Sequence, residues 1–102
     1  MSEVESSIQD RVIKYLRGRG AYVRNIPGSS ATGKGTADLL VCYRGLFLAI
    51  ELKKPDGSYG ETKPQEIRRR QVTRAGGLAL VARSLADVVA IIAQIDEEER
   101  CY

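Results

Sequence analysis

The segment GTADLLVCYRGLFLAIELKK, residues 35–54, places Asp38, Glu51 and Lys53 inside two apolar runs typical of buried strands. Side chains alternate between the faces of a strand, so Glu51 and Lys53 project from the same face. The central RG pair is typical of a hairpin turn, which sets Asp38 opposite Glu51. Two carboxylates this close repel unless a cation separates them, and Mg²⁺ prefers oxygen ligands. The spacing predicts a metal site, with Lys53 beside it to assist a water or stabilise phosphate charge.

A purely structural arrangement of the same residues is the alternative. Asp38 and Lys53 would form a cross-strand ion pair, and Glu51 would lie in solvent at the end of the sheet. Glu51, however, follows the five apolar residues LFLAI, where an unpaired charge is costly. Both interpretations stay open from the spacing alone, which favours the metal site slightly.

Residues 28–34, GSSATGK, match the first seven positions of a phosphate-binding P-loop. That motif continues with Ser or Thr and then with a helix whose N-terminus faces the phosphates. Here Gly35 takes the hydroxyl position and a strand-like run follows. We therefore expect a flexible cationic loop beside a site, and no nucleotide cofactor.

The residue types restrict both the chemistry and the location. With no histidine and two cysteines, the chain cannot use a His general base, a Ser-His-Asp triad or a cysteine-only zinc site. Carboxylates, lysine, hydroxyls or a hard metal remain. Two distant cysteines favour reduced thiols. No apolar run approaches the roughly 20 residues that span a bilayer, and the N-terminus is acidic, unlike a signal peptide. We expect an intracellular, cytoplasmic protein of a bacterium or of a virus in its host, with no membrane partner.

Charge is unevenly distributed although the net charge is only +3. Residues 11–37 include six basic side chains and no acidic one, and residues 68–74 carry four arginines. The acidic residues gather at 96–99. Such segregation is typical of a phosphate-contacting face, although solvated helix faces explain it equally well.

At 102 residues the chain, 1–102, is expected to form a single domain around one core. Apolar spacing predicts a first helix over 4–16 that ends at Gly18 and Gly20, and a second over 64–75 that ends at Gly76-Gly77. Strands are expected at 21–26, 36–43, 46–53 and 78–83. A last helix begins after Ser84, with Leu85, Val88, Val89, Ile92 and Ile95 as its apolar stripe, and ends in an acidic frayed tail over about 96–102. The order αβββαβα predicts an α/β fold, a four-stranded mixed sheet flanked by helices.

These motifs, in this order, resemble the PD-(D/E)XK nuclease superfamily, and most closely its compact VRR-NUC branch. The resemblance rests on Asp38 followed after 12 residues by ELK, and it covers about residues 4–95. Further matches are Glu5 in the first helix, GLFLAIE at 45–51, Pro-Gln at 64–65 and Gly-Gly at 76–77. One position departs from the family: Ala37 stands where the family has proline.

The resemblance implies a restriction-endonuclease-like core and a Mg²⁺- or Mn²⁺-dependent endonuclease that hydrolyses DNA phosphodiester bonds. By position, Asp38, Glu51 and the backbone carbonyl of Leu52 would bind the metal. Lys53 would support the attacking water, Glu5 would approach the metal shell, and Gln65 would position substrate or water.

Family members made of this domain alone resemble homodimeric Holliday-junction resolvases. Branched DNA is therefore the expected substrate and a second copy the expected partner. The basic residues expected to contact DNA are Arg24, Lys34, Lys54, Arg68 and Arg69. The alternative is a catalytically inert DNA-binding module on the same fold.

Overall fold

A computed structural model of the chain describes residues 4–26, 37–53 and 63–99, with the backbone alone at 4–7, 37–38 and 99. The elements are α1 (Val4–Gly18), β1 (Tyr22–Ile26), β2 (Ala37–Tyr43), β3 (Leu46–Leu52), α2 (Lys63–Arg74), β4 (Leu78–Ala82) and α3 (Leu85–Glu99). The predicted order of helices and strands is confirmed, and most boundaries fall within two residues of the prediction.

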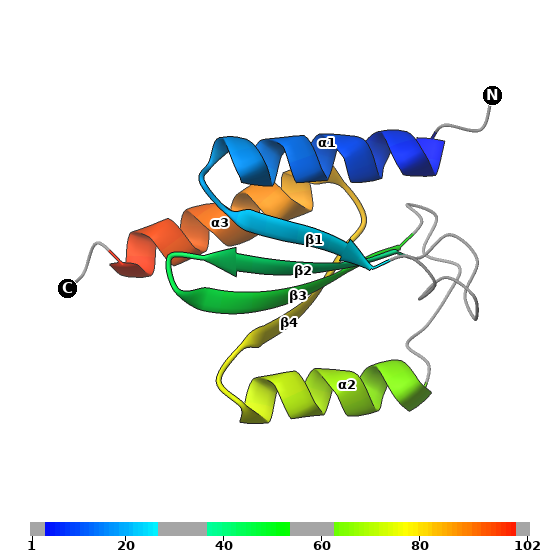
Figure 1. Cartoon of the computed structure of the whole chain (residues 1–102), viewed down its shortest axis with the longest axis vertical. Coiled ribbons are helices and arrows are strands. Elements are labelled where there is room, and N and C mark those ends of the chain that lie inside the picture. Colours follow the sequence, from blue (N-terminus) through cyan, green and yellow to red (C-terminus); the bar gives the residue numbers. More distant parts are fainter. Residues whose placement is uncertain (1–3, 27–36, 54–62, 100–102) are drawn as a thin grey trace.

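The four strands form one mixed sheet in the order β1-β2-β3-β4. The first two pairings are antiparallel, and β4 lies parallel to β3. Helices α1 and α3 cover one face of the sheet and α2 lies on the other (Figure 1). The expected α/β class, with helices flanking a four-stranded mixed sheet, is therefore confirmed.

The β2–β3 hairpin has the tight turn that the sequence predicts. Arg44 and Gly45 both have positive φ, 55° and 80°, as a two-residue type I′ turn requires. The turn pairs Tyr43 with Leu46, and the register along the strands then sets Asp38 opposite Glu51. The pairing on which the predicted site depends is thus present in the backbone.

The core lies between the sheet and the helices α1 and α3. Apolar side chains of β2 and β3 alternate into it, and Leu39, Leu48 and Ile50 are essentially inaccessible. Helix α2 contributes no buried residue, as its weak apolar pattern predicts. One face of the sheet therefore carries the packing, which leaves the other free for polar side chains.

Helix α1 ends in a Schellman motif, the predicted glycine stop. Gly20, at φ 91°, takes the left-handed position. The amide of Ala21 donates to the carbonyl of Leu16 and that of Gly20 to Arg17, both at 3.0 Å. Ala21 and Leu16 are both buried, which is the apolar contact that accompanies this motif.

Helix α2 ends in the same way at Gly76-Gly77. The amide of Gly77 donates to the carbonyl of Val72 at 3.0 Å, and Gly76 has φ 98°. A Cβ at Gly77 would lie 3.0 Å from both Cδ2 and the carbonyl oxygen of Phe47, and 3.1 Å from Cγ1 of Val72. The lack of a side chain at Gly77 thus allows α2 and β3 to approach closely.

Gly77→Ala is accordingly expected to lower the free energy of unfolding by about 1–3 kcal/mol, because the added methyl group overpacks against a backbone oxygen. Gly18→Ala is the matched control. Gly18 lies in a helix, and a Cβ there meets nothing within 4 Å. It is expected to raise stability by up to about 1 kcal/mol. Urea unfolding of both variants tests the pair, and equal stability for Gly77→Ala and wild type would contradict the close approach.

Two expectations for the last helix are wrong. Val89 was assigned to the apolar stripe but is 37% exposed, whereas Val88, Ile92 and Ile95 are buried as expected. The acidic segment does not begin as a frayed tail at 96, because α3 continues to Glu99. The helix is held at this point because Asp96, next to the buried Ile95, accepts side-chain hydrogen bonds.

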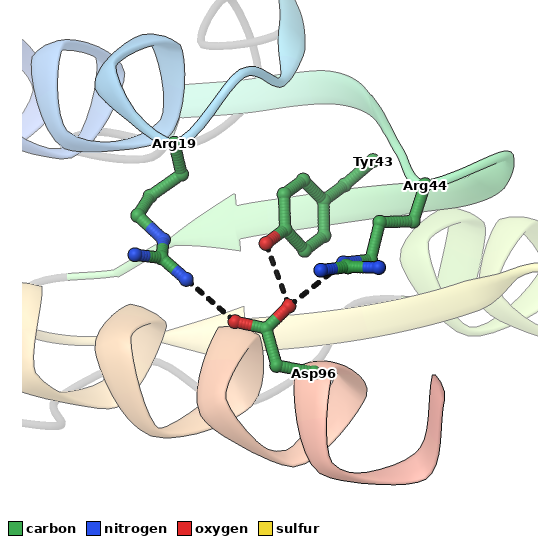
Figure 2. A network of polar contacts seen from close by, with 4 residues as sticks. All are labelled: Arg19, Tyr43, Arg44 and Asp96. Carbon is green, nitrogen blue, oxygen red and sulfur yellow. Dashed lines mark hydrogen bonds and ion pairs between the residues drawn. The ribbon is translucent and has the colours of Figure 1, made fainter. Parts of the chain in front are cut away.

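Asp96 accepts three side-chain hydrogen bonds from segments far apart in the sequence (Figure 2). Arg19 donates at 2.6 Å, the Tyr43 hydroxyl at 2.7 Å and Arg44 Nε at 2.9 Å. The network joins the end of α1, the β2–β3 turn and α3. The Tyr43 hydrogen bond, with those of Arg19 and Arg44, lowers the pKa of Asp96 below its ordinary value of 3.8 although partial burial opposes this.

This pKa shift predicts an acid-sensitive contribution to stability. Because the pKa of Asp96 is lower in the folded than in the unfolded chain, the ionised network stabilises the fold above the ordinary pKa of 3.8. The contribution is lost as pH falls through the lower folded value. The stability difference between wild type and Asp96→Asn should therefore be constant from about pH 7 to pH 5 and shrink below about pH 4.

Urea unfolding at each pH measures that difference. Asp10→Asn, which removes an exposed carboxylate of α1, corrects for the general effect of losing one negative charge. A difference for Asp96→Asn that does not shrink below pH 4 would contradict the role of the ionised carboxylate.

No helix in the described ranges combines the length and apolar character needed to cross a membrane.

Candidate active site

The predicted site residues converge at one end of the sheet. The start of α1, the start of β2, the end of β3 and the start of α2 all lie at this end (Figure 1). Chain direction alone brings them there, since β2 and β3 are antiparallel and α2 begins after β3 ends. The side chains of Glu5 and Asp38 fall outside the described part of the structure, so their predicted roles stay predictions.

Lys53 is the charged residue buried within the described part of the chain, with 6% of its surface exposed. Its backbone amide donates to the carbonyl of Ala82 at 3.0 Å, which extends the β3–β4 ladder by one residue. Its Nζ donates to Oε1 of Gln65 on α2 at 3.3 Å. A buried cation costs free energy unless polar groups meet it, and Gln65 is one such group.

A pocket lies between the sheet and α2. Its polar lining is Glu51 from β3 with Gln65, Arg68 and Arg69 from α2, and its walls include Leu40 and Ala49. Both arginines are exposed, whereas Glu51 is half-buried. A carboxylate below two guanidinium groups offers oxygen to a cation and charged donors to phosphate oxygens, which suits a phosphodiester with a divalent ion.

Helix α2 presents its charges in two directions. Glu66 accepts from Arg70 at 2.7 Å one turn later, and Lys63 lies 3.9 Å from the same carboxylate. Arg68 and Arg69 instead line the pocket. Since none of the residues of α2 is buried, the helix serves mainly as a support for polar groups over the sheet.

Four of the predicted residues thus line one pocket: Glu51, Gln65, Arg68 and Arg69. Lys53 joins them through Gln65. Arg24 lies further out on β1, exposed, opposite Leu40 of the pocket wall. The side chain of Leu52 points into the core, where it is 5% exposed, which leaves its carbonyl as the predicted ligand.

The remaining predicted residues lie outside the described ranges. These are Lys34, Lys54 and the P-loop-like stretch at 28–34. The element that follows that stretch is a strand, β2 from Ala37, and not the helix that a P-loop requires. Within the described part of the chain no three acidic or cysteine side chains gather to hold a metal ion. The metal set therefore remains a prediction that involves Asp38.

The predicted site did not include the apolar walls of the pocket. Leu40, Ala49, Ala79 and Val81 line it beside the polar groups. Leu40 and Ala49 share the strand face of Asp38 and Glu51, so the alternation of β2 and β3 was the signal that could have placed them. The contribution of β4 depended on its parallel pairing with β3, which no local pattern encodes.

Comparison of the chain with protein-family models, with curated proteins and with solved structures finds no match.

Proposed function

We propose that this protein is a metal-dependent endonuclease that hydrolyses phosphodiester bonds of DNA, with branched or junction DNA as its preferred substrate. Its fold would then be the restriction-endonuclease-like αβββαβα core of the VRR-NUC type, and it would act as a homodimer. Two copies would place two sites on symmetric strands and would contact more phosphates than one small domain can.

The observation that carries the proposal is the position of Lys53. The side chain is buried at the end of a central strand and bonded to Gln65, 12 residues away on α2. The resemblance implies one role for Lys53 and another for Gln65, and it does not specify a contact between them. A buried lysine departs from ordinary core composition, and departures of this kind are expected at functional sites.

The donor set fits a hard divalent ion. Glu51 lines the pocket, and the β2–β3 register places Asp38 opposite it on the neighbouring strand. These carboxylates, with the Leu52 carbonyl, would hold Mg²⁺ or Mn²⁺, and Glu5 would lie nearby. Such an ion, when bound, lowers the pKa of water and neutralises phosphate charge.

The chain's own side chains supply the rest. Lys53 would hold the attacking water through Nζ and stabilise negative charge on the phosphate, and Gln65 is hydrogen bonded to that nitrogen. Arg68 and Arg69 at the pocket rim would bind phosphate oxygens, because guanidinium groups match their geometry. Arg24, Lys34 and Lys54 would extend contact with the DNA backbone.

A cleavage assay tests the proposal. The protein is incubated with a four-way junction and with a linear duplex of the same sequence, in Mg²⁺, Mn²⁺ or EDTA. We expect cleavage of the junction with either metal, less of the duplex, and none in EDTA. Glu51→Ala should remove cleavage in both metals, because it removes a ligand.

The alternative, an inert DNA-binding module, predicts a different result: metal-independent binding with no cleavage in any condition. Equal cleavage of both DNAs would instead contradict the junction preference alone.

A further inference from the structure

Among the described elements, α2 covers only part of the sheet face that carries the pocket. Helix α2 packs against β4 on that face, and α1 and α3 lie on the other (Figure 1). The part formed by β1 and β2 lies beyond α2. Phe47, at the start of β3, lies beside the end of α2, where a Cβ at Gly77 would be 3.0 Å from its Cδ2. One row across these strands is Tyr22, Cys42 and Phe47, which are direct register partners.

The side chains of this row are more exposed than aromatic rings and thiols usually are. Tyr22 is 66% exposed and Phe47 42%, and Cys42 between them is an exposed free thiol. Arg24, two residues after Tyr22, is exposed on the same face, because Val23 between them points into the core. Arg24 thus adds a positive charge beside the row.

Geometry connects the row to the pocket. Strands lie about 4.8 Å apart, so Tyr22 and Phe47 are separated by roughly 10 Å, enough for each ring to accept a base of its own. Phe47 and Glu51 lie four residues apart on the same face of β3, or about 13 Å. An unpaired strand of a few nucleotides can span that distance.

We propose that Tyr22, Phe47 and Arg24 form a stacking platform for an unpaired DNA strand that leads into the pocket. Exposed aromatic rings on an open sheet stack on bases of any sequence, and a neighbouring arginine binds the backbone. The identity of the ligand as DNA rests on the proposed function. The platform would explain a preference for branched DNA, since a junction supplies unstacked bases where a linear duplex does not.

A second copy of the chain is the other occupant to consider. A standard protein interface uses about 20–30 residues on each side, with a continuous apolar centre. The row offers two rings and a thiol next to a cation. Its charge and its connection to the arginine-rimmed pocket favour a polyanion.

Binding of a fluorescein-labelled single-stranded 12-mer, measured by anisotropy in EDTA, tests the platform without cleavage. Tyr22→Ala should weaken binding about 5- to 150-fold, the range for losing one stacked base. Phe47→Leu, which keeps an apolar side chain, should also weaken it, and Tyr22→Phe should restore it. Val89→Ala, an exposed apolar residue of α3 on the other side of the sheet, is the matched control and should have no effect.

Cys42 provides a second readout inside the row. In a Cys101→Ser background, the 12-mer should slow alkylation of Cys42 by iodoacetamide, and a blunt duplex should slow it less. Unchanged affinity in Tyr22→Ala, or no protection of Cys42 by the 12-mer, would overturn the platform. So would protection that rises with protein concentration without DNA, which would identify a second copy as the occupant.

The two proposals fail separately. Cleavage of junction DNA with an unprotected Cys42 would overturn the platform and leave the nuclease. Protection of Cys42 by the single strand, without cleavage in any metal, would support the platform and overturn the nuclease.

Discussion

Lys53→Met is expected to slow metal-dependent cleavage by about 100- to 1,000-fold, the range for losing one donor that stabilises charge in the transition state. The free energy of unfolding should stay within about 1 kcal/mol of wild type or increase. Methionine has a similar length and no charge to desolvate, and Gln65, which loses its hydrogen bond to Nζ, is half-buried and can bond to water instead. The variant thus separates the cost of the lysine to the fold from its benefit to the reaction.

The measurements are initial cleavage rates on a four-way junction, and urea unfolding in the same buffer. Lys14→Met is the matched control, because it removes the same charge from an exposed position on α1. It should change cleavage by less than about threefold, through long-range electrostatics alone. Full cleavage by Lys53→Met would contradict the catalytic role of Lys53. A loss of stability above about 2 kcal/mol would show that Lys53 stabilises the fold.

Leu48→Ala is expected to lower the free energy of unfolding by about 2–5 kcal/mol. Leu48 is completely buried on β3, between β2 and β4, so its removal leaves a cavity that neighbouring strands cannot easily fill. Small domains have only about 5–15 kcal/mol of stability in total, so the variant should be close to unfolding at moderate temperature.

Leu78→Ala is the comparison for that result. Leu78 is the register partner of Leu48 on β4, at the edge of the sheet, and is 37% exposed. It should lose clearly less stability than Leu48→Ala in urea unfolding, because less apolar surface returns to water. Equal losses would place the packing centre of the domain elsewhere than β3.

The backbone of the site could be predicted because local rules determine it. A two-residue turn fixes the register of a hairpin, and the alternation of a strand then fixes which residues share a face. Asp38 opposite Glu51 follows from the turn at Arg44-Gly45 alone. Glycine stops defined the ends of α1 and α2 for an equally local reason, the left-handed cap.

The rest depends on contacts between distant segments. The parallel pairing of β4 with β3 and the pocket walls follow from how the chain crosses over, which the sequence does not show locally. Asp96 is the clearest case. The sequence predicts it as part of an acidic frayed tail, but Arg19, Tyr43 and Arg44 donate hydrogen bonds to it. Charge clusters in a sequence do not reveal which member is paired.

The mixed sheet also determines the order in which the site can be assembled during folding. The antiparallel pairs β1–β2 and β2–β3 join neighbouring segments of the chain, and closing them costs little entropy. The parallel β3–β4 pair can form only after the chain has crossed through α2. Glu51 should therefore reach its native position early, whereas Gln65 and the arginines of α2 arrive last. The three-stranded meander is thus the part of the site that sequence-local pairing builds, and the pocket is the part that the long-range β3–β4 pairing completes.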